Sequence, residues 1–193
     1  MKKALALIFA IIMIVTCFAA CGNTNSDDTL KIPVESLDGV ERGSFEKFTA
    51  IDLAGKKVTE KIFKGKKLTM INIWGTFCDP CINELPGLAT LNKEYADKDF
   101  QVIGIVCDVN YSGDGYDASL YNDALEIVEM TGADFVNLLP SNSLDMIRLR
   151  EVYTVPETIF VDENGKVVGQ NYIGSRSLES WKAIVDSVLA EME

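Results

Sequence analysis

The residues best suited to chemistry in this chain are two cysteines, Cys78 and Cys81, which are separated by two residues. The apolar segment 68–74 precedes them, and a segment with leucines at helical spacing follows. This order predicts a strand that delivers the dithiol to a helix N-terminus, where backbone N–H groups and the helix dipole stabilise a thiolate. We expect an exposed Cys78 to attack a disulfide, and Cys81, one turn into the helix, to resolve the mixed disulfide.

The same pair could instead form half of a zinc site. Zinc takes four ligands, and the chain contains no histidine and no second Cys-x-x-Cys pair. The absence of histidine also argues against Ser–His or Cys–His catalysis and against histidine-ligated haem. The sequence therefore favours a redox role, and we expect no bound metal.

Charge and length limit the remaining function classes. The 193 residues carry a formal net charge of −11 and show no basic stripe. Binding of nucleic acid requires clustered Lys and Arg, so we expect no nucleic-acid partner. The length is sufficient for one domain with a substantial core.

The N-terminus has the composition of a targeting segment. Lys2 and Lys3 precede the apolar run 4–20, which ends in small residues directly before Cys21. This arrangement resembles the lipobox of bacterial lipoproteins, which implies a lipoprotein signal peptide at 1–20, cleavage before Cys21 and lipid attachment to its sulfur. The alternative is an uncleaved anchor with an incidental cysteine. Both interpretations place the rest of the chain outside the cytoplasm, at the membrane.

Two further regions follow the targeting segment. Residues 21–44 are polar and rich in turn formers, without a sustained apolar period, which predicts a flexible tether. Residues 45–193 alternate between short apolar runs and helical patterns, which predicts a single folded domain. Its first part, 48–58, has two apolar runs around Ala54-Gly55 and indicates a β-hairpin.

The pattern of the domain is that of an α/β protein, with a central mixed β-sheet flanked by helices and an N-terminal β-hairpin extension. Pro86 should kink the first helix, and Asn164-Gly165 indicates a hairpin turn. The expected strands are 68–74, 100–106, 158–161 and 166–172, and the expected helices are 80–95, 117–130, 143–152 and 178–189.

The run from Trp74 to Cys81, Trp-Gly-Thr-Phe-Cys-Asp-Pro-Cys, is followed by Glu84 and Pro86. This C-x-x-C-x-x-E-x-P pattern after a W-G-T strand end resembles the TlpA/ResA branch of the thioredoxin superfamily. The resemblance extends over residues 45–192. It implies a thioredoxin-like fold and a membrane-tethered, extracytoplasmic thiol-disulfide oxidoreductase.

The resemblance also implies roles for residues outside the cysteine pair. Pro156 matches the cis-proline that packs against the dithiol and presents the backbone of Val155 to substrate, although the sequence alone would favour a trans proline before a strand. Trp74 and Phe77 would form an apolar lip that contacts substrate, or would belong to the core. For Trp74 we expect partial burial near the site.

Glu84 lies three residues after Cys81, on the same face of the predicted helix. A half-buried carboxylate there could exchange a proton with the resolving thiol, whereas a lone helical glutamate is more commonly exposed. Asn72 stands where cytosolic thioredoxins carry a buried acid, which leaves Glu84 as the candidate for proton transfer. The simpler interpretation of Asn72 is a polar residue whose hydrogen bonds are satisfied within the strand.

Two other residues bear on reactivity. Asp79 places negative charge beside Cys78, which disfavours its thiolate and predicts a reductant rather than a strong disulfide donor. The alternative is that Asp79 merely complements a helix start. Cys107 follows the strand 100–106, and we expect a buried, inert thiol there, with a third redox cysteine as the alternative.

The chain lacks a flavin or nicotinamide motif, so the Cys78–Cys81 pair would be the only redox group and a membrane protein would have to supply electrons. Family analogy implies a CcdA/DsbD-like electron donor. It also implies apocytochrome c, a methionine sulfoxide reductase or another oxidised exported protein as substrate. We expect a monomer.

Two alternative functions stay open. A peroxiredoxin-like thiol peroxidase would require a P-x-x-x-T-x-x-C pattern, but Thr76 stands two residues before Cys78 rather than three. A non-enzymatic lipoprotein would bind a client, a metal or haem without turnover, and its function would not depend on Cys81.

Overall fold

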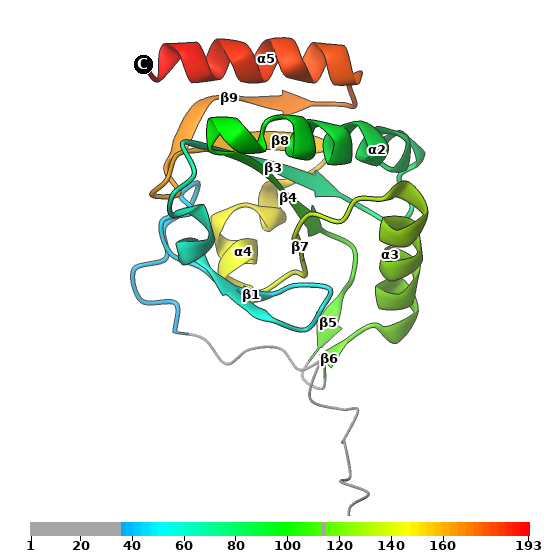
Figure 1. The fold of residues 1–193 in the computed structure, drawn as a ribbon. Helices are drawn as coiled ribbons and strands as arrows, with labels where there is room; N and C mark the ends of the chain where they lie inside the picture. The colour runs from blue at the N-terminus through cyan, green and yellow to red at the C-terminus, as the bar shows by residue number, and fades with distance from the viewer. Residues whose placement is uncertain (1–35, 113–114) are drawn as a thin grey trace, which may run out of the picture.

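A mixed five-stranded β-sheet organises the computed structural model, which describes residues 36–112 and 115–193. The strands lie in the order β7-β4-β3-β8-β9 (Figure 1). β3 pairs in parallel with β4 and antiparallel with β8, so the sheet is mixed as predicted. The strands are β3 (Leu68–Trp74), β4 (Phe100–Val106), β7 (Asn137–Leu138), β8 (Glu157–Val161) and β9 (Val167–Ile173).

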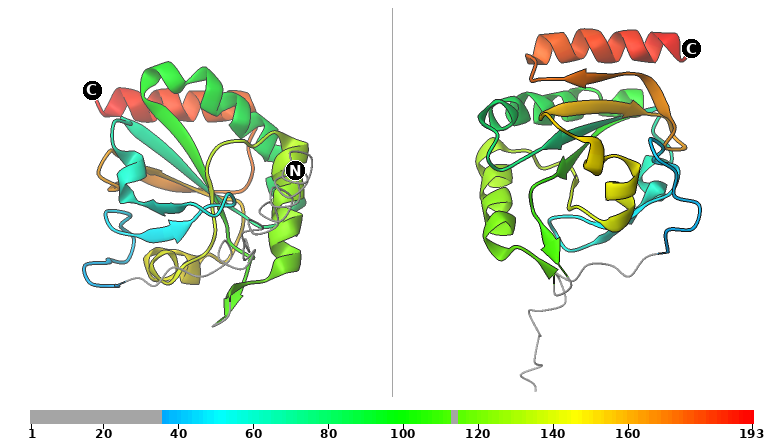
Figure 2. Two further views of the ribbon diagram at one scale, coloured as in Figure 1. Left: turned by 60° about the horizontal axis from the view of Figure 1, so that its bottom comes forward. Right: turned by 180° about the vertical axis from the view of Figure 1, so that it is seen from behind.

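Helices cover both faces of this sheet. They are α2 (Asp79–Glu94), α3 (Ala118–Thr131), α4 (Asn142–Ile147) and α5 (Leu178–Glu191). α5 and α2 lie on one face, and α4 lies on the other (Figures 1 and 2). Because successive side chains of a strand point to opposite faces, Met70 packs in the cluster with the α2 and α5 residues, whereas Ile71 packs in the cluster with α4.

The predicted N-terminal hairpin is confirmed. β1 (Thr49–Ile51) pairs antiparallel with β2 (Lys57–Thr59). The predicted hairpin of β8 and β9 is also confirmed, and its turn contains Gly165 with φ of +84°. A Cβ at this position would lie 2.5 Å from the carbonyl oxygen of Phe45, so both the backbone angle and the close approach require glycine.

The predicted helix 143–152 is wrong in its extent. α4 begins after Ser141, whose Oγ accepts a hydrogen bond from the N–H of Leu144. The helix ends at Ile147. The backbone of the next residue, Arg148, leaves the helical region, and its side chain contacts Glu157 at the start of β8. A short 3-10 helix, Leu149–Glu151, follows.

The short elements escaped prediction. They are the two-residue strand β7, the small hairpin of β5 (Tyr111–Ser112) and β6 (Gly115–Tyr116), and the 3-10 helices Glu60–Phe63 and Ala96–Lys98. β7 is held by parallel pairing with β4 and not by a sequence pattern of its own. Such segments depend on long-range neighbours, which hydropathy patterns do not report.

The predicted signal peptide 1–20, with the proposed lipid site Cys21, lies outside the described residues, as does most of the tether 21–44. The part of the tether that is described contacts the domain, since the N–H of Gly43 donates to the carbonyl of Ile147 at 2.8 Å. Within 36–112 and 115–193, no helix has the length and hydrophobicity that crossing a membrane requires.

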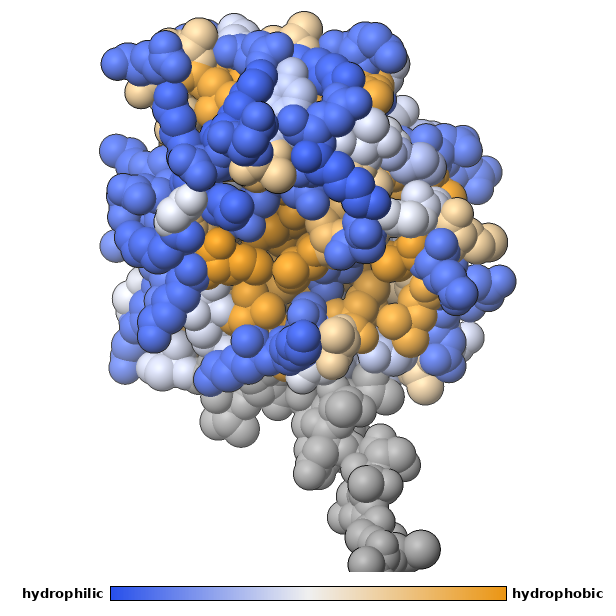
Figure 3. Space-filling model, viewed as in Figure 1, coloured by the Kyte–Doolittle hydropathy of each residue, from blue (hydrophilic) through white to orange (hydrophobic). Residues whose placement is uncertain are grey.

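The visible surface is mixed in polarity. Polar residues dominate the upper and left parts of the face shown in Figure 3, and apolar residues are visible in a hollow at its centre. A pocket of about 490 Å³ includes Leu53 from the first hairpin, Leu125 from α3 and Phe135 in its wall. Neither Cys78 nor Cys81 lines this pocket.

A buried hydrogen bond joins the end of β3 to β7. The indole N–H of Trp74 donates to Oδ1 of Asn137 at 3.1 Å, and Nδ2 of Asn137 donates to the carbonyls of Ala133 and Phe135. A Cβ on Gly104 would lie 2.0 Å from this Oδ1, so glycine leaves the space that the pair occupies.

Asn137→Ala should therefore lower the free energy of unfolding by about 1–3 kcal/mol, because it leaves a buried indole N–H without an acceptor. Urea denaturation of the oxidised protein measures this change. The control Asn122→Ala removes an exposed amide on α3 and should alter stability by about 0.5 kcal/mol or less. Equal effects of the two substitutions would contradict the assigned role of Asn137.

Candidate functional site: a dithiol at a helix N-terminus

The cysteine pair lies where the sequence predicts it, at the start of α2. Cys78 and Cys81 form a disulfide, and Cys78 is the residue immediately before the helix. Its Sγ accepts a hydrogen bond from the backbone N–H of Cys81 at 3.2 Å. Once the disulfide is reduced, a thiolate at this position would receive the same N–H and the positive end of the helix dipole.

The expectation that Cys78 is exposed is wrong. Its exposed fraction is 6 %, and that of Cys81 is 1 %. The loop before β8 covers Cys78, since the carbonyl oxygen of Val155 lies 3.7 Å from its Sγ. Cys78 nevertheless lines a surface pocket of about 480 Å³, so it can be reached through that pocket, whereas Cys81 lies behind it.

Two segments that are distant in sequence form most of the lining of this disulfide pocket. Phe77, Asp79 and Pro80 come from the turn and the first residues of α2, on one side. Each segment contributes one exposed aromatic side chain: Phe77 is 71 % exposed, and Tyr153 of the second segment is 90 % exposed. The opposite wall consists of Leu149, Val152, Tyr153, Thr154 and Val155, of which the sequence indicated only Val155.

The predicted cis peptide bond between Val155 and Pro156 is confirmed. The following residue, Glu157, is 1 % exposed, and its Oε1 accepts hydrogen bonds from Arg148 and Asn171. This partly buried ion pair ties the segment before the pocket wall to the first residue of β8. Arg148 and Glu157 are positioning residues that the sequence analysis missed, because their pairing depends on the fold.

Glu84 is buried, so the interpretation as an exposed helical glutamate is wrong. Its side chain accepts hydrogen bonds from the backbone N–H of Arg176 at 2.8 Å and from the indole N–H of Trp181 at 2.5 Å. Burial raises the pKa of this carboxyl above its ordinary value, although these hydrogen bonds and the charge of Arg176 oppose the rise. Trp181 lies within the expected helix 178–189, but no sequence pattern indicated its contact with Glu84.

Asn72, in β3, contacts Glu84 of α2. Its Nδ2 donates to Thr158 Oγ1 at 3.1 Å and to Glu84 Oε2 at 3.4 Å. Its Oδ1 has no hydrogen-bond partner among the described residues, although the residue is buried. The expectation of a satisfied polar residue therefore holds for the amide nitrogen and fails for the oxygen.

The two aromatic residues expected at the lip behave differently. Trp74 is fully buried, so the expectation of partial burial is wrong; its indole N–H is held by Asn137 inside the core. Phe77 lies at the mouth of the pocket. A Cβ on Gly75 would lie 2.7 Å from the Phe77 ring, so glycine at this position lets the ring lie against the turn.

The turn before Cys78 is fastened to the end of β4. Asp108 accepts hydrogen bonds from the backbone N–H of Thr76 at 3.0 Å and from its hydroxyl at 2.6 Å. The neighbouring Cys107 is half-buried and lines the disulfide pocket, so the expectation of a buried thiol is only partly met. Burial, with the nearby charge of Asp108, raises the pKa of the Cys107 thiol to about 11, which keeps it protonated and unreactive at neutral pH.

The described residues contain no group of three or more His, Cys, Asp or Glu side chains with the placement of a metal site. What they contain is a disulfide whose outer sulfur caps a helix, a cis-proline loop against it and a buried carboxyl further along the same helix. On this α/β sheet, these features define a thioredoxin-fold protein for thiol-disulfide exchange.

Comparison with known proteins agrees with this class. Residues 43–170 match the AhpC/TSA family. The thiol-disulfide oxidoreductase ResA of Bacillus thuringiensis subsp. konkukian is 27% identical over 173 residues, which cover 87% of this chain and 88% of that protein. The thiol:disulfide interchange protein DsbE of Vibrio cholerae is 27% identical over 88% of this chain and 83% of its own length.

The fold has relatives among solved structures. A thiol:disulfide interchange protein of the thioredoxin family from Chlorobium tepidum superposes with a TM-score of 0.60 at 20% identity, over 81% of this chain and 99% of that one. The chain belongs to the AhpC/TSA family. Within it, the chain is an enzyme of the ResA and DsbE type, a thiol-disulfide oxidoreductase with a thioredoxin-like fold.

The raised pKa of Glu84 makes stability depend on pH. A carboxyl whose pKa is higher in the folded state stabilises the fold fully below its unfolded value of 4.5, and this contribution is lost as pH rises through the folded pKa. Glu84→Gln removes this titration. The stability of the variant relative to the native chain should therefore increase with pH in that window, by up to about 1.4 kcal/mol per pH unit.

Urea denaturation of the oxidised proteins between pH 4 and pH 8 measures this difference. The control, Glu163→Gln, changes an exposed glutamate in the turn after β8 and should give a curve parallel to that of the native chain. Parallel curves for Glu84→Gln as well would show that Glu84 does not titrate abnormally.

Proposed function

We propose that the chain reduces disulfides in exported proteins, with Cys78 as the attacking thiol and Cys81 as the resolving thiol. The observation that carries this proposal is the position of Cys78, whose sulfur caps α2 and lines a pocket while Cys81 lies behind it. A substrate sulfur can approach Cys78 through that pocket. Cys81 can then be reached only by the sulfur of Cys78.

The exchange transfers two electrons. The Cys78 thiolate attacks one sulfur of the substrate disulfide, and the other substrate sulfur leaves as a thiolate that takes up a proton. The Cys81 thiolate then attacks the sulfur of Cys78, which releases the first substrate sulfur as a second thiolate. The substrate ends as a dithiol, and the Cys78–Cys81 disulfide is regenerated.

Glu84 is suited to the proton transfer at Cys81. It is buried three residues after Cys81 on α2, and its raised pKa brings it closer to the range in which it can both accept and return a proton. Arg176 and Trp181 hold one carboxylate oxygen, and Asn72 faces the other. We infer that Glu84 takes the proton of Cys81 when Cys81 attacks.

The proposed direction is reduction. Asp79 is exposed in the first turn of α2, next to Cys78, and no histidine is present to add positive charge. Negative charge beside Cys78 disfavours its thiolate, and a less stable thiolate makes the dithiol a better reductant.

The proposed setting is the extracytoplasmic face of the bacterial membrane. The support is the sequence of residues 1–20 and Cys21, which predicts a signal peptide and a lipid anchor, with the tether 21–44 as a spacer. A CcdA/DsbD-like membrane protein would reduce the disulfide after each turnover. Substrates would be oxidised exported proteins such as apocytochrome c or a methionine sulfoxide reductase. The chain would act on them as a monomer.

The peroxidase alternative receives support from the AhpC/TSA match but not from the site. The hydroxyl of Thr76, the candidate threonine of that pattern, is engaged by Asp108. A peroxide-consumption assay of the reduced chain separates the two activities.

The variant Cys81→Ser should accumulate mixed disulfides with substrate proteins, because Cys78 still attacks and nothing resolves the product. Non-reducing electrophoresis of cells that express the variant detects these adducts, and mass spectrometry identifies the attached protein. The control Cys107→Ser should accumulate none, and Cys78→Ser/Cys81→Ser should abolish them. A functional Cys81→Ser chain without adducts would support the non-enzymatic alternative and would overturn the proposal.

A further inference from the structure

A second groove adjoins the disulfide pocket at Phe77. It has a volume of about 440 Å³ and is lined by Thr76, Phe77, Asp123, Glu126, Ile127 and Met130. Phe77 lines both cavities, so its ring stands between them. A polypeptide segment that brings a sulfur to Cys78 therefore has a path across Phe77 onto α3, and we call this second cavity the α3 groove.

The α3 groove exposes apolar side chains that a folded monomer does not need on its surface. Met130 is 68 % exposed at one side, and Phe77 is 71 % exposed at the other. Together with Tyr153, they are three of the large apolar side chains that the described residues leave exposed, and all three line one of these two cavities. Exposed apolar surface next to a reactive sulfur is a feature of interaction sites.

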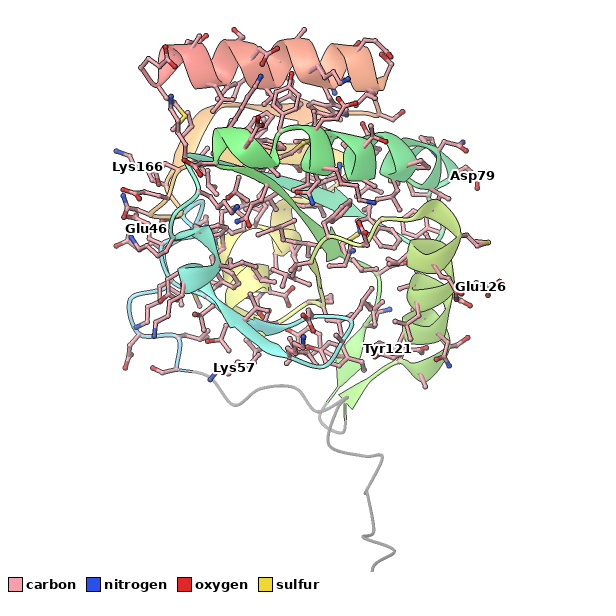
Figure 4. All side chains as sticks on the ribbon, in the orientation of Figure 1. Glu46, Lys57, Asp79, Tyr121, Glu126 and Lys166 are labelled. Atoms are coloured by element: carbon pink, nitrogen blue, oxygen red, sulfur yellow. A yellow bond between two sulfur atoms is a disulfide. The ribbon has the colours of Figure 1, made fainter. Side chains whose placement is uncertain are left out.

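The carboxylates of the α3 groove carry unpaired negative charge. Asp123 and Glu126 are exposed and three residues apart, which places them on the same side of α3. Neither forms an ion pair with any described residue, and α3 contains no lysine or arginine. Figure 4 shows Glu126 and Asp79 on the same side of the molecule, opposite Lys166.

We propose that the α3 groove binds a lysine- or arginine-bearing segment of the substrate protein, adjacent to the cysteine that Cys78 attacks. A long basic side chain suits both features of the groove. Its aliphatic stem can lie on Met130 and Phe77 while its charged end reaches Asp123 and Glu126. This inference rests on the proposed function and specifies the class of substrate: a protein disulfide with basic flanking residues.

Two synthetic peptides test this specificity. Both contain the same intramolecular disulfide and differ only in whether lysine or glutamate flanks the cysteine. The rate of disulfide reduction by the reduced full chain is measured for each peptide. The lysine peptide should react about tenfold faster at low ionic strength, and the ratio should fall as salt is added, because the contacts are exposed.

Variants separate the groove from the general negative charge of the protein. Asp123→Asn/Glu126→Gln should reduce the ratio of the two rates to near one. The matched control Glu163→Gln/Glu191→Gln removes two exposed carboxylates elsewhere, from the β8–β9 turn and the end of α5, and should keep the full ratio. Loss of the ratio in the control as well would assign the preference to net charge and overturn the proposal.

The outcomes distinguish this inference from the function on which it rests. Reduction of neither peptide would contradict the proposed reductase. Reduction of both peptides at equal rates, or faster reduction of the glutamate peptide, would leave the reductase intact and overturn the groove proposal. Faster reduction of the lysine peptide, with loss of preference only in the groove variant, is the expected result.

Discussion

The hydrogen bond from the Cys81 N–H to the Cys78 sulfur is the interaction on which the chemistry depends. It fixes the reactive sulfur at the N-terminus of α2, where the free N–H groups and the helix dipole stabilise a negatively charged sulfur. Because β3 and β4 are parallel neighbours, the turns that follow them lie at the same end of the sheet, beyond the carboxyl ends of the two strands. There Asp108 holds Thr76, so the turn that delivers Cys78 is anchored from outside its own element.

The site separates two chemical environments along one helix. Cys78 faces a pocket with an exposed apolar rim, whereas Cys81 and Glu84 lie inside the protein. Burial of Glu84 is unfavourable for its charged form, and the N–H groups of Arg176 and Trp181 offset part of that cost. Glu84 therefore shares the buried environment of Cys81 rather than that of the pocket.

The sequence was sufficient for the features that local patterns encode. β3 and β4 are predominantly apolar runs, and both were predicted with the bounds that the structure has. The Cys-x-x-Cys spacing located the disulfide, and the family pattern located the cis bond before Pro156. What it could not supply depends on distant partners: Asn137 accepts the buried indole N–H of Trp74, and α4 ends at Ile147, next to Arg148, whose side chain contacts Glu157. The contact between Val155 and the sulfur of Cys78 likewise joins residues that are distant in sequence.

The reduction potential of the Cys78–Cys81 couple tests the central claim most directly. Equilibration of the full chain in thiol redox buffers, with the two states quantified by alkylation and mass spectrometry, gives this potential. An acidic neighbour and the lack of histidine predict a value on the reducing side, nearer to thioredoxin at about −270 mV than to strong oxidants at about −120 mV. A potential close to that of the strong oxidants would contradict the account, because such a dithiol would donate disulfides rather than reduce them.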